Sequence, residues 1–289
     1  LILLDNNVLA SERFKDIIKD IKSLGFGKGA TYTYKNKAGR ATTVSRYIDF
    51  NQGLDSRLLT EEKMELLSEI AIRPIRIAFD HIGLRSLYEE KVRLAARYGL
   101  KYLSNYILYN FHDRPNEFYE RLKINLDLNE EIGLQIFSFP MRYVDLKSKN
   151  RLSKTPGNIG EHWNAKYLRA IQCVLVRTRG LVGTKRDYFL KAFGKDLEEF
   201  NKILLMPESY IIHRYQHEGD GSTDKWWAQV CSLSDWEQDI FKHIIHNHLF
   251  RTVNRTELTR GVKDVLDHYI EQDVRKKSFV GNESKYWKQ

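Results

Sequence analysis

The chain has 289 residues, of which 42% are apolar and 29% are charged. This composition predicts a folded protein with a substantial core and excludes an intrinsically disordered chain. No apolar run is long enough to cross a membrane, and no secretory leader is recognisable, so we expect a cytoplasmic protein.

The charge balance is basic, with 47 lysines and arginines against 38 acidic residues and a net charge of +9. This excess allows RNA or a protein as a partner without requiring one, and no DNA-binding motif is present. The two cysteines, Cys173 and Cys231, are far apart in the sequence. The simplest expectation is two reduced thiols that pack as small apolar groups.

The first 145 residues alternate between short apolar runs and amphipathic segments. Residues 1–5 predict a buried strand, and because a chain rarely starts inside its own sheet, we expect a piece of a longer polypeptide. Residues 27–46 are basic and rich in Gly, Thr and Tyr, which predicts an exposed loop or hairpin, most simply a solvated insertion. Further strands are predicted at residues 47–50, 75–79, 106–109 and 134–139, and helices at residues 11–23, 60–70, 84–98 and 118–128.

The segment from residue 106 to residue 139 reads as strand, crossover helix and strand, which implies a parallel sheet. The repetition of such units predicts a partial (β/α) barrel or an open doubly wound sheet. No GxGxxG follows a strand and no GxxxxGK[ST] occurs, so dinucleotide and P-loop nucleotide sites have no support. The predicted strands end in polar residues, where the chemistry of parallel α/β proteins gathers.

The sequence changes character after residue 145. Residues 146–160 are polar and basic and predict a connector, and residues 161–289 predict an all-α C-terminal region that ends in a frayed tail. Its helices are predicted at residues 163–179, 186–193, 197–205, 207–216, 236–249 and 255–269, with a break at Gly219 and Gly221. Its tryptophans, Trp226, Trp227 and Trp236, are expected in the helical core; the alternative is that they stack on bases or anchor a partner. The histidines at positions 243, 246 and 248 lack the HExxH pattern of a zinc site.

Two stretches, YIDFNQGLDSRLL at residues 47–59 and IRIAFDHIG at residues 75–83, resemble the radical S-adenosylmethionine (radical SAM) superfamily. The likeness covers roughly residues 1–215 and includes LDNN, YILYNFHDRPNEFYERL, LQIFSFPMRY, WNAKYLRAIQ and FGKDLEEFNKILLMPE in the same order. It implies a partial radical SAM barrel of parallel strands followed by a helical extension, with S-adenosylmethionine and a [4Fe–4S] cluster as cofactors. The family's cluster motif, CxxxCxxC, is absent. The resemblance therefore implies that its cysteines lie upstream of Leu1 and that this chain alone does not hold the cluster.

The resemblance also implies that the strand ends line a cofactor and substrate cavity. Residues after the first predicted strand would accept hydrogen bonds from the cofactor's ammonium group, and those after the second would bind its ribose or carboxylate. Pro140 and Met141 would pack against adenine. The alternative for each polar residue alone is a turn or a helix cap. The candidate cofactor-binding residues are Asp5, Asn6, Asn7, Asn51, Gln52, Asp80, His81, Asn110, Pro140 and Met141.

The leading hypothesis is a fragment of a radical SAM enzyme, which would cleave S-adenosylmethionine reductively to a 5′-deoxyadenosyl radical and modify a substrate that the sequence does not reveal. The competing hypothesis is a non-catalytic barrel remnant that binds RNA or a protein through its basic surface. A third hypothesis, an ordinary barrel lyase or isomerase, needs a divalent metal or a matched acid–base pair, for which Asp80 and His81 give little support.

Overall fold

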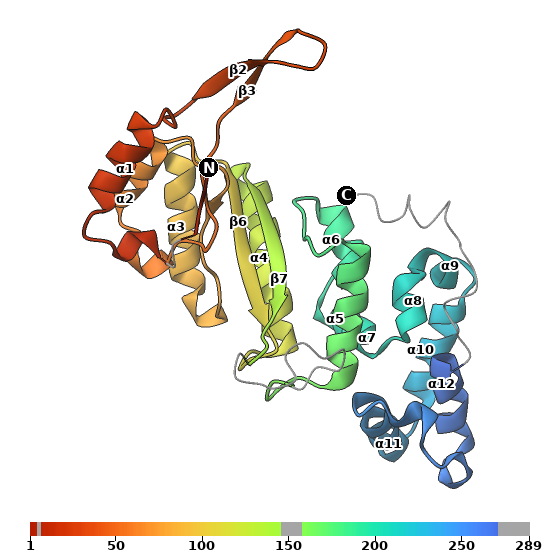
Figure 1. Ribbon diagram of the computed structural model, residues 1–289. Coiled ribbons are helices and arrows are strands. Elements are labelled where there is room, and N and C mark those ends of the chain that lie inside the picture. Colours follow the sequence, from red (N-terminus) through yellow and green to blue (C-terminus); the bar gives the residue numbers. More distant parts are fainter. Residues whose placement is uncertain (5–6, 146–157, 271–289) are drawn as a thin grey trace. The chain divides into compact units, whose positions relative to one another are not determined.

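The computed structural model describes residues 1–4, 7–145 and 158–270 (Figure 1). The chain separates into two compact units, Leu1–Leu108 with Glu120–Met141 and Tyr109–Tyr119 with Arg142–Gln289. Most of the predicted connector, the predicted tail and the candidates Asp5 and Asn6 lie outside the described residues. Within the described residues, no helix combines the length and the apolar character needed to cross a membrane.

The first unit contains short parallel strands in two small sheets. Strand β1 (Ile2–Leu3) pairs in parallel with β4 (Asp49–Phe50), and a second sheet has the order β5 (Ile75–Arg76), β6 (Tyr102–Tyr109) and β7 (Gln135–Arg142). Parallel bridges also pair Ile48 with Ile72 and Leu54 with Ile77, so the neighbouring strands follow one another in chain order. The predicted mixed α/β class with parallel pairing is confirmed, and the described strands do not close a barrel.

Amphipathic helices connect these strands: α1 (Phe14–Ser23), α2 (Glu61–Ser68), α3 (Arg85–Arg97) and α4 (Pro115–Ile132). Helix α1 buries Phe14, Ile18 and Ile21, which recur at helical spacing and form one face. Helix α2 begins where the Oγ1 of Thr60 accepts a hydrogen bond from the backbone N–H of Lys63, 3.3 Å away. The alternation of strands and helices follows the apolar periodicity. The prediction that the first strand is buried was wrong, because Leu1, Ile2 and Leu4 are 46%, 65% and 72% exposed.

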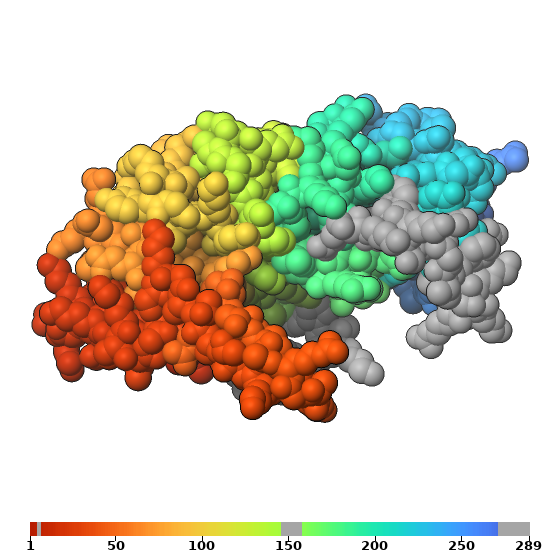
Figure 2. Space-filling model, turned by 90° about the horizontal axis from the view of Figure 1, so that it is seen from above, coloured from red at the N-terminus to blue at the C-terminus, as the bar shows by residue number. Residues whose placement is uncertain are grey.

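Between α1 and β4 the chain forms an antiparallel hairpin of β2 (Thr31–Lys35) and β3 (Ala41–Ser45). Its turn places Gly39 at a φ of 75°, a conformation that favours glycine. In Figure 1 the hairpin stands away from the helices of its unit, and Figure 2 shows red and orange side chains of this part of the chain at the surface. The structure thus selects the hairpin from the two predicted alternatives.

The second unit contains the predicted helices α5 (Ala165–Arg177), α6 (Arg186–Phe193), α7 (Leu197–Leu205), α11 (Asp235–His246) and α12 (Arg260–Ile270). The helix predicted from residue 207 is split at His213 into α8 (Glu208–Ile212) and α9 (Arg214–Gly219), and α10 (Ser222–Ser232) was not predicted. Trp226 is fully buried as predicted, but the prediction for Trp236 was wrong, because its side chain is 62% exposed near the start of α11.

A buried polar network links α3, α4, β6 and β7 of the first unit. The hydroxyl of Tyr88 donates to Oδ1 of Asn125 at 2.7 Å and accepts from Nδ2 of Asn105 at 2.9 Å. Asn125 in turn donates to Oγ of Ser138 at 2.7 Å. Because buried polar groups without partners are strongly destabilising, this network fixes how the helices pack on the sheet.

Replacing Tyr88 with Phe removes the hydroxyl and leaves two buried amide groups short of a partner. We expect the free energy of unfolding in urea to fall by about 1–3 kcal/mol. The matched control is Tyr102→Phe on β6, where the side chain is exposed and a change below about 0.5 kcal/mol is expected. Equal effects of the two substitutions would contradict the network's role.

Candidate functional site

The candidate site lies at the carboxyl ends of the parallel strands in the first unit. We call the residues that follow these strands, Asn7, Asn51, Gln52, Asp55, Asp80 and His81, the strand-end edge. Asn7 follows β1 and precedes a short 3-10 helix at Val8–Ala10, but its side chain does not cap that helix. The Oδ1 atom of Asn7 is buried and has no hydrogen-bond partner among the described residues. A buried acceptor without a donor is costly for the fold, so this atom is a candidate acceptor for a donor that the described residues do not supply.

Asn51 and Gln52 form the turn after β4. Because β4 pairs in parallel with β1, this turn and Asn7 follow the carboxyl ends of neighbouring strands. The backbone N–H of Asn51 donates to the carbonyl of Leu3 at 3.1 Å, and its own carbonyl accepts from the hydroxyl of Tyr106 at 3.2 Å. These bonds hold the turn between β1 and β6. The side chain of Gln52 is exposed and available to a ligand.

A buried arginine from α4 ties together the ends of the next two strand segments. The guanidinium group of Arg121 donates to the carbonyls of Phe79 at 3.3 Å, Asp80 at 2.9 Å and Leu108 at 2.7 Å. Its side chain is fully buried. A planar guanidinium carries five donors in a fixed fork, so this one side chain can satisfy carbonyls from two segments at once.

The carboxyl group of Asp80 lies in an electrostatically unusual position. The residue is exposed, but surrounding protein atoms displace part of the water around its carboxyl group, and this partial desolvation is the main reason why its pKa is raised. The nearby negative charge of Asp55 raises the pKa further. Arg121 and Arg57 act in the opposite direction. The pKa of Asp55 is lowered, mainly by the hydrogen bond from Arg57, whose Nη2 lies 2.7 Å from Oδ2. The pKa values of these two carboxyl groups are therefore shifted in opposite directions.

The other candidates have distinct environments. Nδ1 of His81 accepts from the backbone N–H of Gly83 at 3.0 Å and so caps the short helix Ile82–Leu84, which leaves Nε2 directed elsewhere. Pro140 and Met141 lie inside β7 and not beyond its end, since this strand continues to Arg142. Proline has no N–H and is suited to the outer strand of a sheet, which β7 is among the described strands.

Asn110 belongs to the second unit and is fully buried with a φ of 69°. Its Nδ2 donates to the carbonyls of Tyr143 and Asn158, both at 3.1 Å, and its Oδ1 accepts from the N–H of Gly160 at 2.8 Å. These bonds stabilise the fold around the amide of Asn110, whereas Oδ1 of Asn7 has no partner among the described residues. The structure thus collects Asn7, Asn51, Gln52, Asp80 and His81 in one unit and gives Asn110 partners in the other.

The second unit has a hollow of about 460 Å³ that the sequence did not reveal. Lys202 lies with its ammonium group 5.5 Å from the ring centre of Trp227 on this surface. The hollow is lined by Lys195, Asp196, Glu198, Glu199, Lys202 and Trp227.

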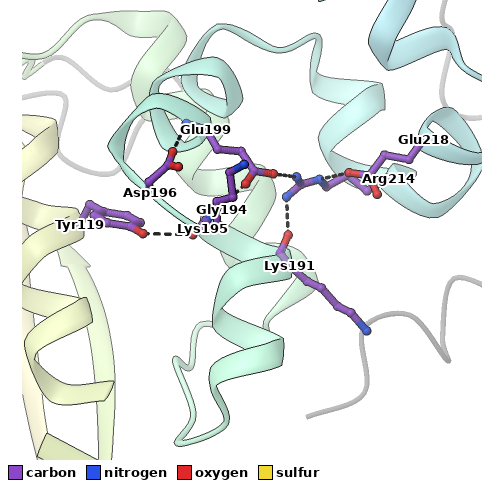
Figure 3. Close-up of polar contacts among 8 residues, drawn as sticks. All are labelled: Tyr119, Lys191, Gly194, Lys195, Asp196, Glu199, Arg214 and Glu218. Atoms are coloured by element: carbon purple, nitrogen blue, oxygen red, sulfur yellow. Dashed lines mark hydrogen bonds and ion pairs between the residues drawn. The ribbon is translucent and has the colours of Figure 1, made fainter. Parts of the chain in front are cut away.

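Figure 3 shows how the acidic groups beside this hollow are already engaged by the fold. Oδ1 of Asp196 caps α7 by accepting from the N–H of Glu199 at 2.9 Å. The buried guanidinium of Arg214 contacts the carboxylates of Glu218 at 2.9 Å and Glu199 at 3.5 Å, and it also donates to the carbonyl of Lys191. Because these groups serve the packing of α6, α7 and α9, the hollow is a weaker candidate than the strand-end edge.

Lys166 in α5 is the most unusual titratable group of the second unit. Its side chain is 1% exposed, and its ammonium group donates to the carbonyl of Met206 at 2.5 Å. Burial lowers its pKa to about 8, although the neighbouring Cys173 and Glu208 oppose this shift. A lysine of lowered pKa is a candidate base or nucleophile, but this one has no open path to solvent and is engaged with the backbone.

Comparison of the chain with protein-family models, with curated proteins and with solved structures finds no match. The described residues also contain no group of three or more His, Cys, Asp or Glu side chains arranged to hold a metal ion. The groups that characterise the strand-end edge are the Oδ1 of Asn7, the carboxyls of Asp80 and Asp55 with pKa values shifted in opposite directions, and the buried guanidinium of Arg121.

The opposite pKa shifts of Asp80 and Asp55 can be tested in a pH titration that follows the side-chain carboxyl carbons by NMR. We expect Asp80 to titrate above the ordinary Asp value of 3.8 and Asp55 below it. Arg57→Gln removes the hydrogen bond to Asp55, so the pKa of Asp55 should rise in this variant. Identical titration of the two carboxyls would contradict the described edge.

The buried Lys166 predicts a pH-dependent stability. Between pH values of about 8 and 10.5 the unfolded chain holds the lysine proton while the folded chain releases it, so stability should rise with pH through this window. Lys166→Met should be more stable than the unchanged chain near neutral pH, by at most about 3 kcal/mol, and this advantage should shrink as pH rises. Urea unfolding across this range measures it. The matched control is Lys19→Met, which changes an exposed lysine side chain of α1.

Proposed function

We propose that this chain provides the cofactor-binding part of a radical SAM enzyme and that the strand-end edge of its first unit binds S-adenosylmethionine. The observation that carries the proposal is the buried Oδ1 of Asn7 at the carboxyl end of β1, which has no hydrogen-bond partner among the described residues. In parallel α/β proteins ligands bind at this end of the strands. An ammonium group is a strong donor that would satisfy the orphaned oxygen.

The order of the strands supports a partial radical SAM barrel. Strands β1, β4, β5, β6 and β7 follow one another in chain order, with parallel pairing wherever the register is given and a helix between each pair. A sheet with this succession can curve toward a barrel, whereas a doubly wound sheet reverses its strand order. The likeness of residues 47–59 and 75–83 to the family agrees with this succession.

Residues on this edge fit the polar part of the cofactor. Asn7 would accept from its ammonium group, and the exposed amide of Gln52 together with Asn51 would bind its ribose or carboxylate. Asp80, whose carboxyl is partly deprived of water, would accept from a hydroxyl. When cleaved reductively, S-adenosylmethionine supplies a 5′-deoxyadenosyl radical, and the task of these residues is to bind and orient the cofactor.

The residues of this chain do not fit the [4Fe–4S] cluster. Such a cluster is held by cysteine thiolates, and the chain has only Cys173 in α5 and Cys231 in α10. The prediction that both pack as small apolar groups is confirmed for Cys173 and was wrong for Cys231, which is exposed. Cys173 is buried, and burial raises its pKa to about 11, so it is held as a thiol. The cluster ligands would therefore have to come from a segment or a chain other than the one described, and no catalytic step is assigned to these residues.

The proposal is tested by isothermal titration calorimetry with S-adenosylmethionine on the chain as it stands and on Asn7→Ala. We expect binding by the unchanged chain and a loss of roughly 10-fold or more in affinity for the variant, because a hydrogen bond to a charged group is worth about 1.5–3 kcal/mol. The control is Asn116→Ala, which changes an exposed asparagine at the start of α4.

Two results would contradict the proposal. The first is the absence of any binding of S-adenosylmethionine, which would favour the non-catalytic binding module. The second is equal affinity of the Asn7 and Asn116 variants, which would show that the cofactor binds elsewhere. Circular dichroism of both variants establishes that neither substitution alters the helical content.

A further inference from the structure

The hairpin β2–β3 is an exposed surface that the proposed cofactor site does not use. All five residues of β2 are exposed, and the two strands pair in register from Thr31 with Ser45 to Lys35 with Ala41. The hydroxyls of Thr33 and Thr43 form a hydrogen bond of 2.8 Å across one face. A two-stranded hairpin with no apolar cover has little to stabilise it alone, so its composition needs another reason than packing.

The opposite face of the hairpin carries two aromatic rings. Tyr32 and Tyr34 are 48% and 44% exposed, and their ring centres lie 5.9 Å apart. Their cross-strand partners are Val44 and Thr42, both short side chains that leave the rings uncovered. The result is a small aromatic platform open to solvent.

All charged side chains in the hairpin segment, residues 21–48, are positive. No acidic residue occurs between Asp20 and Asp49, while four exposed cations occur in and beside the hairpin: Lys28, Lys35, Lys37 and Arg40. None of these four forms an ion pair among the described residues. A solvated surface more often mixes both charges, and like charges without partners repel one another. The arrangement is therefore suited to a polyanion.

The base of the hairpin is fixed by a fifth cation. The Nη1 atom of Arg46 donates to the carbonyls of Leu24 at 3.3 Å and Gly25 at 3.0 Å, and its guanidinium lies 4.5 Å from the ring centre of Phe26. The same guanidinium is 5.9 Å from the ring centre of Tyr32. This anchor holds the platform in place while leaving the charged tip free.

We propose that the hairpin binds single-stranded nucleic acid, with Tyr32 and Tyr34 stacking on bases and the cations at residues 35, 37 and 40 contacting phosphates. Exposed aromatic rings beside unpaired cations are the two elements of single-strand recognition. A protein partner fits less well, because lysine is depleted at protein interfaces. This inference is independent of cofactor binding by the strand-end edge.

The test is fluorescence anisotropy of a labelled mixed-sequence RNA of about 20 nucleotides, and of the matching DNA, titrated with the full chain over a series of salt concentrations. Lys35→Gln with Lys37→Gln and Arg40→Gln should weaken binding at least about 10-fold. The slope of log affinity against log salt should become shallower by about 2, since each phosphate contact on a single strand contributes about 0.7. The charge control changes three exposed cations outside the hairpin: Arg13→Gln, Arg97→Gln and Lys101→Gln.

The stacking contribution is tested separately. Tyr32→Ser with Tyr34→Ser should weaken binding at least about 10-fold without changing the salt slope, because stacking is worth about 1–3 kcal/mol per base and about 1.4 kcal/mol is a tenfold change. Tyr32→Phe with Tyr34→Phe keeps the rings and should retain affinity. Trp236→Ser removes an even more exposed ring in α11 and should have no effect.

Three outcomes would overturn the proposal: no binding of either nucleic acid by the unchanged chain, equal losses in the hairpin and control charge variants, or unaltered affinity in the serine variant. The last result would indicate a general attraction of polyanions. Circular dichroism and gel filtration confirm that every variant is folded before binding is compared.

Discussion

The first unit depends on one buried guanidinium. Carbonyl groups at the ends of short parallel strands have no further ladder partners, and buried carbonyls require donors. Arg121 supplies these donors from α4 to the carbonyls of Phe79, Asp80 and Leu108. The same positive charge lowers the pKa of Asp80 and so opposes the effect of desolvation. The interaction that fixes the backbone of the edge therefore also sets the electrostatics of the candidate site.

Polar groups in the structure fall into two classes. The amide of Asn110 and the network around Tyr88 use their hydrogen-bonding groups within the protein and so stabilise it. The Oδ1 of Asn7 lacks a partner among the described residues, and the pKa of Asp80 is raised because its carboxylate is partly desolvated, so both groups are less favourable here than in water. Groups kept in an unfavourable state at the edge of a parallel sheet are the features expected of a binding site.

Much of the fold could be predicted because apolar periodicity is local. The helices α1 to α4 and the strand β6 follow from spacing, and polar residues after the strands located the candidate edge. Arg121 could not be predicted, since in the sequence it is one of many charged residues on an amphipathic helix and its burial depends on carbonyls from distant strands. The helix α10 was missed because Gly221, which adopts a φ of 77° and precedes the helix, suggested only a break. A lone tryptophan such as Trp236 likewise carries no local sign of which face it occupies.

The central claim, that the strand-end edge of the first unit binds S-adenosylmethionine, is tested most directly by mapping NMR shifts on addition of the cofactor. The account predicts that the side-chain amide of Asn7, the backbone amides of Asn51 and Gln52 and the carboxyl of Asp80 shift together and saturate at one ligand concentration. Shifts confined to Glu199, Lys202 and Trp227 around the hollow of the second unit, or no shifts, would contradict it.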